Sequence, residues 1–397
     1  MSAFMWESRE INVAEFNDQP LSTPFSPEIL CFTKAFSETL LCCNKSLYPD
    51  LVALGYWCRP KNISLMQSDF MARNQGYICR PKGSVFQVTP GNVDTLFLYS
   101  GLLSLLMGNR TAIRISQRQT EQLIHLLSLL EGLLQKKEHQ HIARRFLIFS
   151  GEHNSDLISS ISKTCDIRVI WGGDSSIKSI RKVPLSPHAK EISFADRHSI
   201  CLMNADAVCR SDELSLLAAN FYRDVLTYSQ QACSSPKALI WHGCMKDVEK
   251  AMSVFWSAMN EQLSNKPYRL GAAEVINRLT AMQAIAISQN STISDDNIAI
   301  ARLQVDHISE GSLGYHTGYG MLFETQCEEI SMFAEQIIPK FQTLTYFGYD
   351  RSDLLQMLNI ECLMGVDRIC LVGEALNFDS VWDGYDLLQE FCSVLKD

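Results

Sequence analysis

Positive charge is in short supply in this 397-residue chain, which has 35 lysines and arginines against 44 aspartates and glutamates and a formal net charge of −9. Proteins that bind nucleic acids usually carry a basic patch or stripe. We therefore do not expect a nucleic-acid partner. Hydrophobic residues make up 46% of the chain and charged residues 20%, which is typical of a globular protein.

Long apolar segments are missing too. The longest uncharged, largely apolar run covers 95–107, which is shorter than the roughly 20 residues that span a bilayer, so we interpret it as a buried helix. Residues 1–10 mix both signs of charge and have no apolar stretch. Because a secretory signal needs such a stretch, we expect a cytoplasmic protein with no membrane span.

Patterns that bind metals or form disulfide frameworks are also absent. None of the 14 cysteines belongs to a CxxC pair, and the nine histidines show no HExxH or other ligand spacing. A metal site is therefore not expected. Without a secretory signal, the cysteines are interpreted as reduced thiols, most of them small buried hydrophobic residues.

What the chain does contain is a regular alternation of strand-like and helix-like segments from 83 to 177. Strand-like runs lie at 83–90, 112–115, 146–149 and 168–171, and helices are predicted between them, including one over 117–141. This order predicts an α/β fold with an open parallel sheet covered by helices. Another strand at 199–203 suggests that a second domain begins near Ser199.

One cysteine lies in a distinctive setting. The stretch TYSQQACSSPKALIW (227–241) places Cys233 between a helix-like and a strand-like run, with small residues beside it. Reactive cysteines are usually partly exposed, near a helix end or a base, and small neighbours allow an electrophile to approach. Taken alone, the stretch fits a buried, inert thiol better, because free cysteines are more often buried than reactive.

Six segments, in order, resemble the long-chain fatty acyl-CoA reductases of bacterial bioluminescence (LuxC-like), a branch of the aldehyde dehydrogenase superfamily. The resemblance extends from about 47 to 397, and its segments are 53–60, 89–116, 169–181, 187–199, 228–236 and 365–391. It implies an aldehyde dehydrogenase-like fold of two Rossmann-like parallel-sheet domains with the active site between them. The cofactor domain would cover 1–198, completed by about 366–397, and the catalytic domain 199–365.

The resemblance also implies the reaction, an NADPH-dependent reduction of a long-chain fatty acyl thioester, bound to CoA or to a protein, to the fatty aldehyde. Cys233 would accept the acyl group as a thiolate, and sulfur suits this step because it is both a good nucleophile and a good leaving group. Asn92, in Pro90-Gly91-Asn92, matches an asparagine whose amide stabilises the oxyanion. The alternative is that Asn92 only shapes a turn.

The general base is less clearly marked. Oxidising relatives carry a glutamate that activates water, and the comparable segment 193–198 has none, which suits a reductase. His188 matches the position of the histidine proposed as the base in the family, and His198 is a second candidate. Either could lower the thiol pKa as an imidazolium, or be a hydrogen-bonded structural histidine.

Cofactor residues follow from the same resemblance. Gly108-Asn109 with Arg114 and Ser116 resembles a superfamily segment whose basic residue contacts the adenosine ribose or its 2′-phosphate, and an arginine there favours NADPH. The alternative is a solvent-facing arginine. The run Trp171-Gly172-Gly173-Asp174-Ser175 matches the turn that opens a helix under the pyrophosphate, although the chain has no GxGxxG motif.

Two rival interpretations stay open. One is an aldehyde dehydrogenase working in the oxidising direction, and the other is a catalytically silent partner of an acyl-protein synthetase. The missing glutamate counts against the oxidising enzyme, and the presence of Cys233, Asn92 and the cofactor turn argues against a silent partner. Superfamily enzymes often form homo-oligomers through an extended strand arm, which the sequence does not locate, and the sequence leaves open whether the aldehyde serves luminescence.

Overall fold

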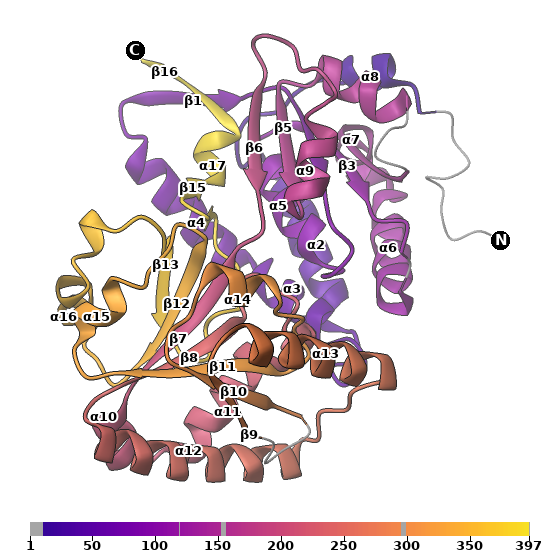
Figure 1. The fold of residues 1–397 in the computed structure, drawn as a ribbon. Helices are drawn as coiled ribbons and strands as arrows, with labels where there is room; N and C mark the ends of the chain where they lie inside the picture. Colours follow the sequence, from indigo (N-terminus) through magenta and orange to yellow (C-terminus); the bar gives the residue numbers. More distant parts are fainter. Residues whose placement is uncertain (1–10, 119, 152–155, 295–298, 397) are drawn as a thin grey trace. The chain divides into compact units, whose positions relative to one another are not determined.

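The computed structural model describes residues 11–118, 120–151, 156–294 and 299–396. It divides into two compact units (Figure 1). The first contains the chain up to Ala195 and again from Phe378, and the second covers Asp196–Asn377. Each unit has its own largely parallel sheet, so the expected α/β class with parallel sheets is confirmed. No helix among the described residues has the length and apolar character needed to cross a membrane.

The first unit is built on a five-stranded parallel sheet with the order β4-β3-β2-β5-β6. Its strands are β2 (Ser84–Val88), β3 (Arg110–Ile115), β4 (Phe146–Ser150), β5 (Ile167–Trp171) and β6 (Lys190–Phe194). Every residue of β2 and β5 is buried, as expected for central strands covered on both faces. The chain runs outward from β2 to β4 and then crosses to β5. The carboxyl ends of β2 and β5 therefore form the topological switch point, where α/β sheets usually bind ligands.

Helices cover both faces of this sheet. An apolar cluster joins the sheet to three of them on one face, which are α1 (Val13–Asn17), α8 (Asp156–Thr164) and α9 (Asp174–Ile180). The remaining helices, α2 (Pro27–Leu41), α3 (Pro49–Trp57), α4 (Pro60–Arg73), α5 (Leu96–Leu106), α6 (Glu121–Leu134) and α7 (Gln140–Arg145), include those packed on β3 and β4. Ten of the eleven α5 residues are buried, which explains the apolar run at 95–107. The prediction of one helix over 117–141 was wrong, because α6 ends at Leu134 and the short helix η1 (Lys137–His139) separates it from α7.

The C-terminal segment completes the first unit. A small hairpin of β14 (Val381–Trp382) and β15 (Tyr385–Asp386) leads into α17 (Leu387–Glu390) and β16 (Cys392–Lys396), and β16 pairs antiparallel with β1 (Tyr77–Pro81). The β1–β16 ribbon exposes four apolar side chains, those of Tyr77, Ile78, Val394 and Leu395. Buried Asn109 anchors this segment, since its Nδ2 donates to the Phe391 carbonyl at 2.8 Å and its Oδ1 accepts from the backbone N–H of Gly83 at 2.9 Å.

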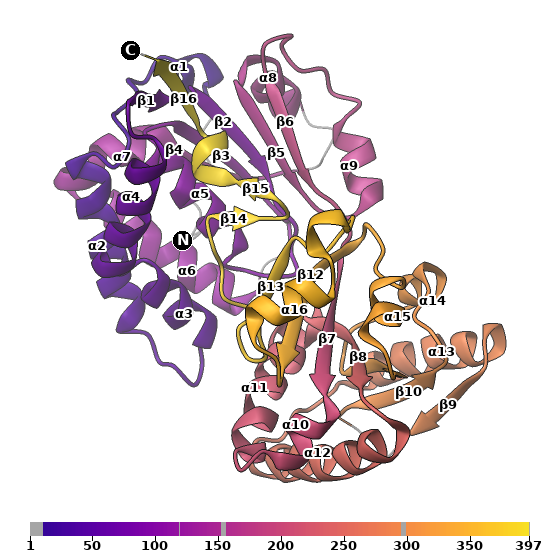
Figure 2. The ribbon, with the colours of Figure 1, turned by 90° about the vertical axis from the view of Figure 1, so that its left-hand side faces the viewer.

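The second unit has a seven-stranded sheet with the order β13-β12-β7-β8-β11-β10-β9, and only β9 runs antiparallel to its neighbour. Its strands are β7 (His198–Asn204), β8 (Pro236–His242), β9 (Ser291–Ser294), β10 (Ala301–Val305), β11 (Met321–Cys327), β12 (Phe341–Phe347) and β13 (Arg368–Leu371). Figure 2 shows β12, β7 and β8 side by side, as their pairing requires. The amino ends of these strands therefore lie at one edge of the sheet.

Two apolar clusters flank this second sheet. One contains the helices α10 (Ala205–Arg210), α11 (Leu214–Leu226) and α12 (Met245–Asn265). The other contains α13 (Ala272–Ser288), α14 (Glu310–Gly314), α15 (Ile330–Ala334) and α16 (Arg351–Met357), and the short helices η2 (Thr227–Gln230) and η3 (Ile360–Cys362) complete the unit. The segment from η2 to β8 contains Cys233.

Candidate active site

Cys233 lies in the turn before β8, at the amino edge of the second sheet. Its side chain is partly exposed. Gln342, near the start of β12, donates a hydrogen bond from its side-chain amide to the Cys233 Sγ, with 3.3 Å between the two atoms. The Ser199 hydroxyl donates to the Cys233 carbonyl oxygen at 2.7 Å. The thiol is therefore accessible, while strands β7 and β12 fix its position.

The backbone immediately before Cys233 is strained. Tyr228, Ser229 and Gln230 have φ angles of 53°, 52° and 60°, in the left-handed region that costs about 1–2 kcal/mol for each residue with a side chain. The Gln230 amide stabilises the bend by donating to the carbonyls of Pro236 and Met321 at 2.8 and 2.9 Å. Strain of this kind is characteristic of functional sites, where the surrounding structure has to hold it in place.

A lysine and a histidine meet beside Cys233. The pairing of β7 with β8 places Ser199 opposite Pro236, so His198 and Lys237 are close, with 2.8 Å between Nδ1 and Nζ. Burial, together with the nearby cations Lys237, Lys340 and Arg197, lowers the pKa of His198 to about 3. This environment disfavours the imidazolium form of His198, so its Nδ1 accepts a hydrogen bond from the lysine.

Lys237 itself is held in an unfavourable place for a cation. Burial lowers the pKa of Lys237 to about 8, and the charges of Cys233 and Asp196 only partly oppose that shift. A buried group with a shifted pKa and a specific charged partner is a frequent mark of a functional site. The ammonium and the thiol are therefore electrostatically linked.

A second histidine of this site is fixed as a neutral ring. His316 Nε2 lies 2.7 Å from the Met321 carbonyl oxygen, and the Gly318 backbone N–H donates to Nδ1 at 3.1 Å. The proton must therefore be on Nε2, since a carbonyl can only accept. Burial lowers the pKa of His316 well below its usual value, and nearby Lys237 adds to this shift.

The predicted cofactor residues gather in the first unit, at the carboxyl ends of β2, β3 and β5. Asn92 is exposed in the bend after β2, and Gly91 packs so closely on Ser116 that a Cβ would lie 2.5 Å from its Oγ. Arg114 is only 8% exposed, its Nε donates to the Gly151 carbonyl at 2.8 Å, and burial lowers its pKa. It is therefore not the solvent-facing arginine of the alternative interpretation.

The turn after β5 reaches the same edge of this sheet. Trp171 is buried and stacks on Phe194 with 3.7 Å between ring centroids. Gly172 follows with a φ of 154°, which side chains rarely tolerate, and Gly173 precedes Asp174 and Ser175 at the start of α9. The turn and the β2 bend thus flank the switch point of the sheet.

His188 is placed differently from these groups. It lies exposed in the turn that precedes β6. Because the strands of the sheet are parallel, this turn is at the amino edge, opposite the carboxyl ends that carry Asn92 and the Gly172–Gly173 turn. The first unit therefore does not bring His188 to its predicted cofactor groups.

Four residues of the Cys233 site were not predicted from the sequence: Lys237, Gln230, Gln342 and His316. The first two flank the cysteine in QQACSSPK, so a buried charge next to the nucleophile was the signal that could have found Lys237. Gln342 and His316 come from distant segments that only the sheet pairing brings to this edge.

All 14 cysteines are free. The expectation that most cysteines are buried was wrong, because only five of them are buried: Cys58, Cys165, Cys201, Cys327 and Cys392. Burial raises the pKa of the partly exposed Cys43, Cys79, Cys209 and Cys370 thiols. Within the described part of the chain, no group of three or more potential ligands could hold a metal ion.

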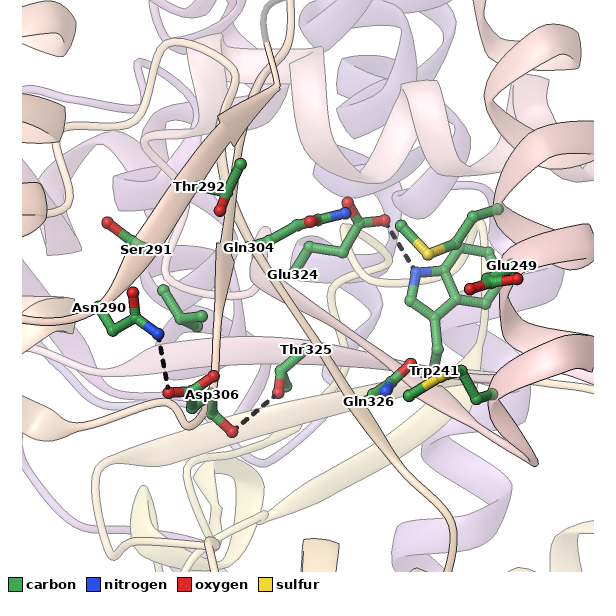
Figure 3. Close-up of a pocket in the computed structure, with 13 residues that line it drawn as sticks. Trp241, Glu249, Asn290, Ser291, Thr292, Gln304, Asp306, Glu324, Thr325 and Gln326 are labelled. Carbon is green, nitrogen blue, oxygen red and sulfur yellow. Dashed lines mark hydrogen bonds between the residues drawn. The ribbon is translucent and has the colours of Figure 1, made fainter.

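A cavity of about 520 Å³ lies elsewhere in the second unit, between α12 and the β9–β10 side of the sheet (Figure 3). Its wall includes Glu324, whose Oε1 accepts from the indole N–H groups of Trp241 and Trp256, each at 2.8 Å. Arg302 donates to Glu324 Oε2 at 3.1 Å. None of the residues predicted from the sequence lines this cavity.

Comparison with known proteins places the chain in a family. The model of the acyl-CoA reductase (LuxC) family matches residues 62–317, which is more than half of the chain. A search of curated proteins found no match.

Several solved structures share the fold. Lactaldehyde dehydrogenase from Escherichia coli aligns with a TM-score of 0.63 at 11% identity, over 96% of this chain and 85% of its own. PnpE in complex with nicotinamide adenine dinucleotide aligns with a TM-score of 0.66 at 10% identity, over 96% of this chain and 87% of its own. The NAD-dependent benzaldehyde dehydrogenase from Corynebacterium glutamicum aligns with a TM-score of 0.62 at 11% identity, over 96% of this chain and 86% of its own. The fold is therefore that of aldehyde dehydrogenases.

Proposed function

The chain belongs to the acyl-CoA reductase (LuxC) family, and we propose that it reduces a long-chain fatty acyl thioester to the fatty aldehyde through an acyl group carried by Cys233. The observation that carries this proposal is the setting of Cys233. It is a partly exposed thiol before β8 that accepts a hydrogen bond from Gln342 and interacts with the Lys237 cation. The acyl donor is a CoA thioester or an acyl-protein.

The Cys233 thiolate attacks the thioester carbonyl, the carbon–sulfur bond to the donor breaks, and the acyl group stays on the enzyme. NADPH, when bound, supplies the hydride that converts the acyl thioester to the oxidation level of an aldehyde. Cys233 then leaves as a thiolate and the aldehyde is released. Asn92 is proposed as a donor to the oxyanion, a role worth a few kcal/mol in other enzymes. The role of His188 as general base stays a prediction.

Binding of NADPH is supported by the groups at the switch point of the first sheet. Two proteins with this fold were solved with such cofactors, PnpE with nicotinamide adenine dinucleotide and 3,6-anhydro-L-galactose dehydrogenase with NAP. The Gly172–Gly173 turn and Ser175 would hold the pyrophosphate. Arg114, oriented by Gly151 and buried enough for a lowered pKa, would bind the 2′-phosphate, with Ser116 beside it.

We also propose that copies of the chain associate through the β1–β16 ribbon. The ribbon has only two strands and exposes Tyr77, Ile78, Val394 and Leu395. An isolated two-stranded ribbon is marginally stable in water, and covering these side chains would stabilise it. This ribbon is the candidate for the strand arm that the sequence did not locate.

The test of the reaction is covalent labelling with a radioactive long-chain acyl-CoA. We expect a hydroxylamine-sensitive adduct in the wild type and in Cys244→Ser, an exposed-cysteine control, and none in Cys233→Ser. NADPH should discharge the adduct and yield the aldehyde. An adduct that NADPH cannot discharge would favour a silent partner of an acyl-protein synthetase. Oxidation of the aldehyde that outruns the reverse reaction would favour the oxidising enzyme, and an adduct in Cys233→Ser would refute the assignment.

Cofactor selectivity is tested separately with Arg114→Gln. A charge-assisted hydrogen bond contributes about 1.5–3 kcal/mol, which corresponds to roughly a tenfold to hundredfold change in affinity. We expect the KM for NADPH to rise by about that factor while the KM for NADH and the acylation of Cys233 stay unchanged. Equal effects on both cofactors would show that Arg114 does not bind the 2′-phosphate.

A further inference from the structure

We propose that Lys237 is the cation that pairs with the Cys233 thiolate, and that His198 is a neutral hydrogen-bond acceptor that positions the lysine. This inference rests on the proposed function, because it assigns how the acyl-accepting thiol is activated. The sequence suggested a histidine for this role. The structure assigns the positive charge to the lysine four residues after the cysteine.

The geometry of the pair defines the role of each partner. Lys237 Nζ lies 2.8 Å from His198 Nδ1, and an ammonium can only donate, so Nδ1 is the acceptor. The proton of the neutral ring is then on Nε2. Ser199, next to His198, donates to the Cys233 carbonyl oxygen at 2.7 Å and pairs with Pro236, next to Lys237. The histidine–lysine pair therefore lies beside the turn that holds Cys233.

The other charged groups around the site leave Lys237 available to the thiol. The groups that face it are Cys233, His198, Asp196, His316 and, around His198, Arg197 and Lys340. Arg197 is paired with Asp367, and Lys340 lies 3.1 Å from Glu310. Both histidines are neutral, so the anions that favour the Lys237 ammonium are Asp196 and the thiolate.

The Gln342 amide adds a second stabilising contact. Its Nε2 donates to Cys233 Sγ at 3.3 Å, and a donor stabilises a thiolate more than a thiol because the anion is the stronger acceptor. The amide is neutral, so it orients the sulfur without supplying charge. Lys237 and Gln342 therefore have separate roles, one electrostatic and one positional.

The proton balance of the reaction fits this pair. Before acylation, the site is the ion pair of the Cys233 thiolate and the Lys237 ammonium, which together hold one proton. As the thiolate attacks and the carbon–sulfur bond of the donor breaks, the departing CoA sulfur takes the proton from Lys237. After hydride transfer, Cys233 leaves the thiohemiacetal as a thiolate, and the lysine takes the next proton from solvent. One proton is consumed in each turnover, as reduction of a thioester to an aldehyde and a thiol requires.

The test measures the thiolate directly, without acyl-CoA. The rate of alkylation of Cys233 by iodoacetamide is followed from pH 5 to 10 by peptide mass spectrometry, which separates it from the other cysteines. An opposite charge close by shifts a pKa by about 1–3 units. We therefore expect alkylation of Cys233 in Lys237→Met to be at least about tenfold slower at pH 7, with its midpoint moved to higher pH.

Matched variants separate charge from structure. Lys237→Arg keeps the cation and should retain most of the wild-type rate, and the exposed Lys246→Met should match the wild type. In His198→Asn, the asparagine Oδ1 can replace Nδ1 as the acceptor, so the alkylation rate of Cys233 should stay close to that of the wild type. In His198→Ala, the rate should lie between those of the wild type and Lys237→Met. An unchanged alkylation profile in Lys237→Met would overturn the proposal.

Failure of this inference can be told apart from failure of the proposed function. If the wild type forms the acyl adduct but Lys237→Met leaves the alkylation profile unchanged, the reaction stands and the lysine pair is refuted. If the alkylation profile shifts but no acyl adduct forms, the ion pair stands and the acyl-transfer function is refuted. Alkylation of the other cysteines in each variant reports whether the fold is intact.

Discussion

The second unit holds two buried clusters of charge that are balanced in different ways. On the α12 side of the sheet, Glu324 is 2% exposed and is fully compensated, because it accepts two indole N–H groups and pairs with Arg302. The Arg302 guanidinium also lies 4.5 Å from the ring centre of Trp256. This cluster is a closed network in which every charge has a fixed partner.

The cluster beside Cys233 is compensated only in part, because the charges of Cys233 and Asp196 do not cancel the effect of burial on Lys237. Lys237 donates to a neutral histidine, and its surroundings lower its pKa. A protein selected for stability alone would have no reason to keep such a cation, whereas a functional site often violates the rules of good packing. The difference suggests that the first network supports the fold and the second supports chemistry.

The largest expected change in stability comes from breaking the ion pair between Arg302 and Glu324. Arg302→Met removes the cation that pairs with Glu324 and leaves the buried carboxylate with its indole donors but without that charge. Breaking a buried ion pair in this way costs about 3–5 kcal/mol of unfolding free energy. Urea unfolding should show this loss, and Arg302→Met combined with Glu324→Gln should recover part of it. Arg210→Met, which breaks an exposed pair with Asp206, should change the stability by less than about 1 kcal/mol. A small effect of Arg302→Met would mean that the two clusters do not differ.

Removing the charge of Lys237 is expected to stabilise the protein, the opposite of the effect expected for Arg302. Lys237 has a folded-state pKa of about 8 against an ordinary value of 10.5, so below pH 8 its charge destabilises the folded protein. The penalty disappears as pH rises from 8 to 10.5, where both states lose the proton. At about 1.4 kcal/mol per pKa unit, the penalty is roughly 3 kcal/mol.

Lys237→Met should therefore be more stable than the wild type at pH 7, by up to roughly 3 kcal/mol. The gain should shrink as the pH approaches 10.5. Urea unfolding at pH 7 and at pH 10 measures both values. A variant that is less stable than the wild type at pH 7 would show that the lysine supports the fold, as Arg302 does.

The sequence predicted much of this fold but not the arrangement of its strands. Alternating strand-like and helix-like runs predicted parallel sheets, because period and strand length are local properties. The strand order, which puts β2 and β5 at the centre of the first sheet, is set by tertiary packing. The break after α6 was missed because the leucine pattern ends at Leu134, while the polar residues that follow are compatible with either a helix or a turn.

The candidate site shows the same division. Cys233 stands out through its neighbours in sequence and through a resemblance, and Lys237 lies within the same short stretch. Whether that lysine is buried depends on β7 and β12, which pair with each other as well as with the segment around it. The neutral state of His198 also could not be predicted, since it follows from burial and from cations that lie far apart in sequence.

The smallest expected loss of stability comes from removing one of the two indole donors to Glu324. Trp256→Phe removes one of the two indole donors to Glu324 Oε1 and keeps most of the ring volume, while Trp241 still donates. Loss of one hydrogen bond to a charged group costs about 1.5–3 kcal/mol, and the remaining partners should hold the loss near the lower value. Urea unfolding measures it.

Trp171→Phe is the matched control for stability, because its buried indole N–H has no hydrogen-bond partner among the described residues. Its removal should cost less than the Trp256 change. Equal costs would mean that ring packing, rather than hydrogen bonding, accounts for the Trp256 effect. The compensation of Glu324 would then come mainly from Arg302, and the contrast with Lys237 would rest on that ion pair alone.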